Sequence, residues 1–373
     1  MMGLMVAMGI GRFAFTPILP LMQRDLGMTH AVAGGLASLN YLGYLAGAVC
    51  CSLFPGMLRN TALNIGALAA TLATTALMGL TLSPFWWGLF RFVGGGASAV
   101  LFVVISAEVA EALVRHGYSR WSGTLFAGVG LGIAVSGIAV PLLDSIGGWR
   151  GSWLGLGLIA LILAVAGILL ADKRQANLAG ATAQTAAKGS LQGIGRLAAA
   201  YFFEGLGYIV SATFLVAMIA RTPGLERFAP WSWVAVGVAA VPSTVLWQMV
   251  ARRFCMRTAL LLAYAVQIAG VLLSIIAADI WTAGIASVCF GGTFLGIVGL
   301  VMAEGNRRAR AEWHRVAALL TACFGAGQVI GPPLAGVVAD GRGGFTIPLL
   351  LAAAMLCLGA GLIATDRNFK KHF

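Results

Sequence analysis

The sequence contains few charged residues, and acidic residues are the rarer kind. Of its 373 residues, 10% are charged, with 24 Lys and Arg against 12 Asp and Glu. Soluble domains carry about 25% charged residues, so this chain has too little polar surface to cover a core in water. Hydrophobic residues make up 60% of the sequence and the mean hydropathy is +0.93. The composition therefore indicates an integral membrane protein.

The sequence also lacks the motifs of metal sites, cofactor sites and enzymes. Its six cysteines lie in or beside apolar segments, without the CxxC spacing of a zinc site or the pattern of a disulfide framework. No GxxxxGK[ST] loop is present, and the Gly-x-Gly pairs follow no strand. No histidine accompanies Ser136 or Ser211 within an apolar segment, and no paired aspartates face one. We therefore predict that the protein is not an enzyme and holds no metal or cofactor.

A net charge of +12 would suit nucleic acid, but the distribution of the basic residues argues against that partner. Nearly all Lys and Arg lie in short segments between apolar runs. Cytoplasmic loops of membrane proteins are enriched in these residues. If the amino terminus is cytoplasmic, seventeen of them lie on the cytoplasmic side and five on the other. We expect both termini in the cytoplasm, a location in the inner membrane, the lipid bilayer as partner and no nucleic acid.

Apolar segments long enough to cross a membrane recur along the whole chain. A spanning helix needs about 20 apolar residues, which predicts an all-helical protein of about twelve spans. The predicted spans are 2–22, 33–54, 62–82, 85–107, 121–143, 150–171, 195–219, 231–251, 258–278, 281–303, 316–338 and 346–365. Residues 172–193 are polar and predict a cytoplasmic linker between bundles 1–171 and 194–373. The first apolar run is too long for a signal peptide and predicts a retained helix, and the sequence leaves open whether native residues precede Met1.

The two halves carry the same pattern. Gly9 lies in the stretch GIGRFAFTPILP, and 196 positions later Gly205 opens GLGYIVSATFL, with Tyr208 at the place of Arg12. The pairs Gly95–Gly96 and Ala107–Glu108, and the stretch DSIGGW from Asp144, recur at the same offset. Because six spans are an even number, both halves start on the same side of the membrane. A binding site is then expected between the halves, near the membrane midplane.

Arg12 is the first candidate for that site, because it lies near the middle of the first apolar run. A cation at the centre of a spanning helix costs roughly 2.5–3.5 kcal/mol on insertion scales. We interpret Arg12 as a counter-charge for an anionic substrate or a gate partner of Glu204, with a structural cation as the alternative. Gly9 and Gly11 permit close helix packing, and Pro17 weakens this helix.

Glu204 is the acidic residue that lies half-way through a predicted helix. It shares a stripe with Tyr201, Tyr208 and Ser211 at helical spacing. A carboxyl in a low-dielectric environment favours its protonated form, which suits proton transfer. The alternative is a static carboxyl that packs the two halves together.

Further polar residues lie at depths suited to a cavity. The expected substrate-cavity residues, besides Arg12, are Asn40, Tyr41, Tyr44, Tyr201, Tyr208, Trp247, Gln267 and Gln328. Each of these can instead serve helix packing. Arg91 lies close to the end of its predicted helix, where its side chain can reach the interface.

These features together resemble transporters of the major facilitator superfamily, over essentially the whole chain. The stretches MGIGRFAFTPILPLM, GLGYIVSATFLVAM and VPSTVLW resemble its YbfB/YjiJ-like branch. The resemblance implies a proton-coupling role for Arg91 in FRFVGGG. It also implies hinge or helix-packing roles for the fifth-helix residues Gly128, Gly137 and Pro141, a motif associated with exporters, although Val140 precedes the proline. We assign the same role to Gly205 and Gly207. The loop PGMLRNTAL lacks the aspartate of the family's intracellular charge latch.

We therefore predict a secondary transporter with two pseudo-symmetric six-helix bundles, acting as a monomer by alternating access. The expected partners are a small organic solute and a proton, with Glu204 and Arg91 as proton-coupling residues. Efflux is preferred. The alternatives are uptake of an organic anion such as a carboxylate, or a sensor with a transporter fold and no net transport.

Overall fold

The computed structural model describes residues 1–115, 119–170, 193–309, 313–342 and 344–369, and these residues form helices and short connections without strands. The amino-terminal half contains α1 (Met2–Leu4), the π-helix η1 (Met5–Ile10), α2 (Phe15–Leu26), α3 (His30–Leu53), η2 (Pro55–Arg59), α4 (Thr61–Leu77), α5 (Pro84–Arg115), η3 (Ser119–Phe126) and α6 (Ala127–Leu170). The other half contains α7 (Gly195–Ala220), α8 (Ala229–Arg253), α9 (Met256–Ile275), α10 (Ile280–Arg308), α11 (Trp313–Arg342) and α12 (Thr346–Thr365). The prediction of an all-helical protein is confirmed.

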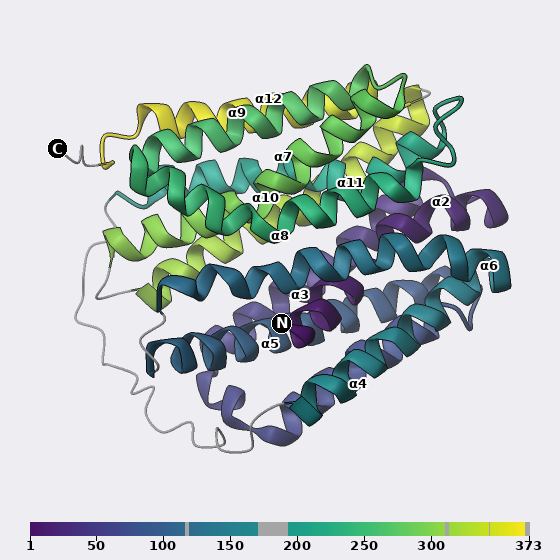
Figure 1. The fold of residues 1–373 in the computed structure, drawn as a ribbon, viewed down its shortest axis with the longest axis horizontal. Coiled ribbons are helices and arrows are strands. Elements are labelled where there is room, and N and C mark those ends of the chain that lie inside the picture. Colours follow the sequence, from purple (N-terminus) through teal and green to yellow (C-terminus); the bar gives the residue numbers. More distant parts are fainter. Residues whose placement is uncertain (116–118, 171–192, 310–312, 343, 370–373) are drawn as a thin grey trace.

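Ten helices of the described chain are long and apolar enough to span a membrane, and α4 is a shorter apolar helix. Helix α6 contains two of the predicted spans, because its backbone leaves helical geometry at Gly147 and Gly148 and folds back (Figure 1). Gly148 has φ +61°, which favours glycine. The span predicted to begin at residue 121 starts as a helix only at Ala127, after η3. The polar linker predicted at 172–193 lies almost wholly outside the described residues.

The first span is interrupted where Arg12 lies. Amides of Gly11 and Phe13 donate to carbonyls five residues earlier, at Val6 and Met8, and the chain turns until α2 begins at Phe15. Such wider turns within helices are frequent at functional sites. The interruption precedes Pro17, since a proline ring clashes with the carbonyl four residues before it. Pro17 itself lies in the first turn of α2.

The helices form two bundles that lie against each other along their length (Figure 1). Within the first bundle α3 packs on α5 and α4 on α5 and α6, while α7 packs on α11 and α12 and α8 on α10 in the second. The bundles meet through α3 with α11, α6 with α8 and α2 with α7. Glycines permit the closest approaches, as at Gly130, where a Cβ would meet the Gly237 carbonyl.

The two ends of the bundles differ in how they are held. We call the end where α6 finishes and α7 begins the linker end, and the end where α2 finishes and α3 begins the His30 end. At the linker end, Arg308 binds Glu304 (2.7 Å) and Asp366 (2.7 Å), which ties the residues after α12 to α10. At the His30 end, the contacts cross between the bundles, as described below.

Candidate functional site

Arg12 lies between the two bundles, at the interruption of the first span. Its guanidinium Nη2 donates to the Gln328 side-chain oxygen of α11 at 2.7 Å. Arg12 is 2% exposed, and its Nε has no hydrogen-bond partner. Within the described parts of the chain, no carboxylate lies within ion-pair distance of Arg12. A buried cation held by a neutral amide is poorly compensated, because buried charges are normally paired.

Aromatic rings surround the Arg12 guanidinium on the side of the first bundle. Its carbon lies 4.1 Å from the ring centre of Tyr44, 5.0 Å from that of Tyr41 and 5.5 Å from that of Phe13. Ring faces attract cations, by about 2 kcal/mol or more when water is excluded. The Tyr41 hydroxyl also contacts Thr213 Oγ1 of α7 across the interface, at 3.4 Å. These contacts hold Arg12 in place while leaving its charge without an anion.

Gln328 connects Arg12 to Tyr208, because its amide nitrogen donates to the Tyr208 hydroxyl. Tyr208 belongs to a set of five nearly parallel rings in the second bundle, which we call the aromatic stack. Tyr208 lies 5.2 Å from Phe324 and 6.0 Å from Phe294, with interplanar angles of 9° and 7°. Tyr201 and Phe290 extend the stack at its two ends. The arrangement places flat apolar faces beside an uncompensated cation.

Glu204 points away from Arg12 and into the second bundle. Its Oε1 accepts a hydrogen bond of 2.7 Å from Gln267 of α9, and its Oε2 has no partner. Glu204 is 1% exposed, and no cation of the described chain pairs with it. Arg12 therefore pairs with Gln328 and not with Glu204, the gate partner considered in the sequence analysis. The stripe on α7 is divided, because Tyr201 and Tyr208 face α11 whereas Glu204 faces α9.

The side chain of Arg91 lies inside the first bundle, enclosed by protein. It is 3% exposed, its Nε donates weakly to the Leu36 carbonyl at 3.4 Å, and its Nη2 has no partner. Asn40 donates to the Arg91 carbonyl at 2.9 Å, so it faces α5 rather than the other bundle. Both line a cavity of about 10 Å³, which also borders Gly11 and has room for about one water molecule. The expectation that Arg91 extends to the membrane surface is wrong, because its guanidinium is enclosed by protein, with the Phe15 ring of α2 at 4.7 Å and the Leu36 carbonyl of α3 at 3.4 Å.

Two other predicted cavity residues, Trp247 and Gln267, lie apart from Arg12. Conversely, some residues that line the site were not predicted from the sequence. Trp247 donates to the Gly292 carbonyl at 2.7 Å, which joins α8 to α10 within one bundle. Gln267 binds Glu204, as described above. Phe324 and Phe294 line the site, but phenylalanines in apolar helices predict only packing. The pairing of Phe13 with Phe294 (6.2 Å) across the interface had no sequence signal either.

The predicted hinge and packing residues lie at close contacts. A Cβ on Gly9 would meet the Gly132 backbone of α6, and one on Gly205 would meet the Phe324 carbonyl of α11. Gly128 faces the Met1 carbonyl and Gly137 faces Val234 of α8. The remaining members are Gly11 beside Thr71, Gly207 beside Leu356, Pro17 in α2 and Pro141 within α6. Their roles in movement stay predictions.

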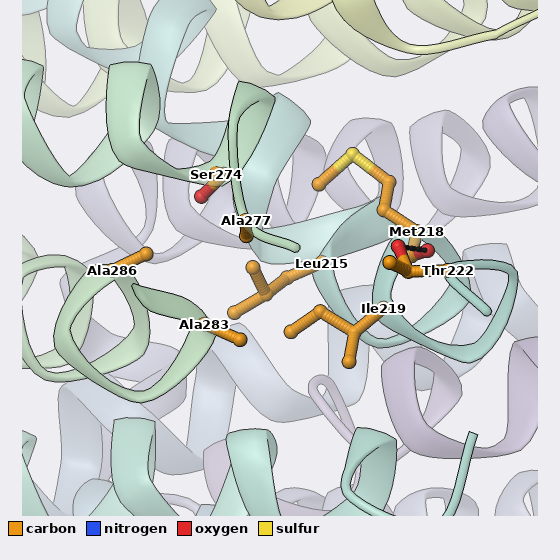
Figure 2. A pocket seen from close by; sticks show the side chains of 8 residues that line it. All are labelled: Leu215, Met218, Ile219, Thr222, Ser274, Ala277, Ala283 and Ala286. Carbon is orange, nitrogen blue, oxygen red and sulfur yellow. Dashed lines mark hydrogen bonds between the residues drawn. The ribbon is translucent and has the colours of Figure 1, made fainter. Parts of the chain in front are cut away.

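A second cavity lies in the other bundle, between α7, α10 and the end of α9. Figure 2 shows its lining of mostly apolar side chains, with the hydroxyls of Thr222 and Ser274 as polar groups. The Thr222 hydroxyl donates to the Met218 carbonyl at 3.2 Å. With a volume of about 10 Å³ and no charged side chain in its lining, this cavity has the properties of a packing defect.

The chain is similar to known membrane transporters. Residues 4–364 match a family described as the uncharacterised MFS-type transporter YbfB. A curated relative, the gentisate transporter of Corynebacterium glutamicum, is 26% identical over 153 residues, which are 41% of this chain. The matched region spans 34% of that relative's length.

Proposed function

Since the chain belongs to the YbfB-type transporters of the major facilitator superfamily, we propose that it carries an organic carboxylate across the membrane together with a proton. The membership makes it a multi-pass secondary transporter. The observation that supports an anionic substrate is Arg12, a buried guanidinium between the bundles that has no carboxylate among the described residues and an unpaired Nε. Arginine binds carboxylates through two parallel hydrogen bonds.

The aromatic stack favours a substrate with a flat ring. Tyr208 and Phe324 present nearly parallel faces beside the amide that holds Arg12. Ring stacking and apolar burial select such a substrate, while the guanidinium orients its carboxylate. The relative that transports gentisate supports this class, because gentisate is a dihydroxybenzoate. In the structure the Gln328 side chain accepts the hydrogen bond from Arg12 that a substrate carboxylate would accept. Binding of the substrate therefore requires the bundles to separate.

The separation of Arg12 and Glu204 favours uptake of substrate and proton together. Arg12 bonds to Gln328 and Glu204 bonds to Gln267, so the anion site and the proton site do not share a residue. Both sites can then be filled at once, whereas exchange usually depends on competition for one site. Efflux against protons, preferred from the sequence, is the second candidate. Uptake with a proton and efflux against protons are distinguished in proteoliposomes in which the protein has a single known orientation. The two mechanisms require opposite directions of the imposed pH gradient for accumulation of the substrate.

The test of the anion site compares charged and neutral ligands of one shape. Gentisate, benzoate and benzamide are titrated into purified protein, and binding is followed by calorimetry. Arg12→Met should weaken both carboxylates at least about tenfold, because a charge-assisted hydrogen bond contributes about 1.5–3 kcal/mol. Binding of benzamide should change little.

Two further variants complete the test. Gln328→Glu supplies a carboxylate partner to Arg12 and should compete with the substrate, so that carboxylate binding weakens while the fold is kept. Arg227→Met, a change at an exposed arginine, is the matched control. If Arg12→Met weakens benzamide as much as benzoate, or if wild-type protein binds neither carboxylate, the proposed anion site is wrong.

A further inference from the structure

The His30 end is closed by a cluster that joins both bundles around one histidine. We call His30, Gln23, Arg221 and Asp340 the His30 lock. Arg221 Nη1 at the end of α7 contacts His30 Nε2 at 2.5 Å. The Asp340 carboxylate of α11 accepts from the backbone amides of His30 (3.0 Å) and Ala31 (2.8 Å), so one bundle caps a helix of the other. Capping the amino terminus of a helix with a carboxylate is stabilising.

The contact with Arg221 fixes the protonation state of the imidazole. A guanidinium has donors and no acceptor, so His30 Nε2 must accept and must carry no proton. The proton of the neutral ring is then on Nδ1, which lies 2.9 Å from the side-chain amide of Gln23. The structure places the Gln23 nitrogen Nε2 at this distance, and turning the amide by 180° presents its oxygen to the Nδ1 proton, since the orientation of a glutamine amide is assigned from its hydrogen bonds. The closed lock therefore contains a neutral His30.

The surroundings of His30 allow its titration to act on the contact between the bundles. The charged groups that face it are Arg221 from α7 and Asp340 from α11, while α2 contributes the uncharged Gln23. Phe345 and Phe214 cover the ring, with centres at 4.6 Å and 6.1 Å. His30 is 4% exposed, whereas Arg221 is an exposed residue, so water reaches the arginine but not the imidazole that it contacts.

We propose that His30 is a proton-operated latch, and that protonation of its Nε2 releases Arg221 and opens the His30 end of the transporter. A second proton on the ring places two cations in contact and removes the acceptor that His30 offers to Arg221. Asp340 attenuates this repulsion but does not replace the lost hydrogen bond. The proton thereby favours the conformation in which the bundles separate at this end. The inference goes beyond the carboxylate proposal and does not depend on it, since it requires no substrate.

The experiment measures the opening directly in the full chain. Spin labels are attached at Leu82→Cys, between α4 and α5, and at Arg227→Cys, between α7 and α8, with the six native cysteines replaced by Ala. Both positions are exposed and lie at the His30 end of opposite bundles. Distances between the labels are measured by double electron–electron resonance in lipid nanodiscs without substrate. The measurements are made at about pH 8 and about pH 5.5, on either side of the ordinary titration of histidine.

In the wild-type background, the population with the longer distance should grow at least about threefold at the lower pH, as expected of a linked two-state equilibrium. His30→Gln supplies a neutral acceptor that cannot be protonated, and its distances should not respond to pH. His30→Lys supplies a permanent cation and should give the longer distance at both pH values. His314→Gln, at the first turn of α11, is the control for loss of a histidine and should respond like wild type.

The latch is wrong if the wild-type distances do not change with pH, or if His30→Gln responds as the wild type does. If His30→Gln does not fold, as judged by size-exclusion chromatography, Arg221→Gln provides the same decision. That variant keeps a donor for Nε2 and removes the cation, so its pH response should be smaller than that of wild type. An undiminished response in Arg221→Gln would also contradict the proposal.

Discussion

The Thr16 hydroxyl donates to the Ala212 carbonyl at 2.5 Å, and these two residues are separated by 196 positions, the offset of the repeat. Equivalent positions of two related halves can touch only close to the axis that relates them. This contact therefore locates the pseudo-symmetry axis between α2 and α7, on the His30 side of Arg12. Arg12 and Tyr208 are also equivalent by this offset, and both bond to Gln328. The site thus lies next to the axis that relates the two halves.

Thr16→Val should weaken the closed arrangement of the His30 end. Valine keeps the shape of threonine and removes the donor to Ala212, so about 0.5–1.5 kcal/mol of the contact between the bundles is lost. This corresponds to a roughly twofold to twelvefold larger ratio of open to closed form. The label pair used for the latch measures that ratio at fixed pH. Thr16→Ser, which keeps the hydroxyl, is the control and should behave as wild type. If both variants behave alike, the hydrogen bond does not hold this end closed.

Residues that are equivalent in the two halves make different contacts at the His30 end. Asp340 and Asp144 are equivalent, yet Asp340 caps α3 of the other bundle while Asp144 binds Arg24 of its own bundle at 3.0 Å. The equivalent of His30 is Glu226, which contacts the nearby Gly224 amide. The lock is therefore present on the α3–α11 side and lacks a counterpart on the α6–α8 side among the described residues. This asymmetry concentrates the proton-sensitive contact at one helix pair.

The sequence predicted the helical class, most of the spans and the central position of Arg12 because these depend on local composition. Hydrophobic length determines where a chain can cross a membrane, and a cation is conspicuous within such a run. The partner of Arg12 was not predictable, because Gln328 is 316 positions away and a glutamine in an apolar helix suits many contacts. The direction of Glu204 was equally hidden, since a stripe of residues at helical spacing still covers a wide angle.

The aromatic stack shows another limit of sequence reasoning. Phe324 and Phe294 look like ordinary packing residues, and only the crossing of α7, α10 and α11 makes their rings nearly parallel. The sequence predicted that Pro17 weakens this helix, but not that the interruption lies at Arg12, several residues earlier, because the clash of a proline acts on the preceding turn. Tertiary contacts therefore decide which polar and aromatic residues meet, while composition decides where the helices are.

The attachment of the segment after α12 should persist at neutral pH and loosen in acid. Burial of Asp366 raises its pKa, but hydrogen bonds from the Asn368 amide and from Arg308 outweigh this effect and bring the pKa below its ordinary value. A lowered pKa contributes stability above the unfolded value of about 3.9, and this stability is lost as the pH falls through the folded value. Hydrogen exchange of residues 364–369 should therefore be constant from about pH 8 to pH 5, after correction for intrinsic rates, and accelerate below about pH 4.

Asp366→Asn provides the matched variant for this segment. Loss of a charge-assisted hydrogen bond to Arg308 should cost about 1.5–3 kcal/mol of local stability, although Glu304 continues to bind Arg308. Protection of residues 364–369 should fall at neutral pH, with α7 and α11 unaffected. Asp279→Asn, at the exposed start of α10, is the control. Unchanged protection in Asp366→Asn would mean that Arg308 does not hold this segment.

Glu204→Gln should uncouple transport from the pH gradient while leaving the carrier able to exchange substrate. The glutamine keeps the size of the side chain and the acceptor for Gln267, so the packing between α7 and α9 is retained. It cannot bind or release a proton, and so an imposed gradient can no longer drive accumulation. In proteoliposomes, gradient-driven uptake of a carboxylate such as gentisate should fall to background, whereas counterflow of labelled against unlabelled substrate should remain within about threefold of wild type, because Arg12 is untouched. Glu111→Gln, a carboxyl paired with Arg115 outside this site, is the control and should keep both activities. If Glu204→Gln still accumulates substrate in response to the gradient, the proton is carried elsewhere, and Arg91 beside its water-sized cavity becomes the next position to substitute.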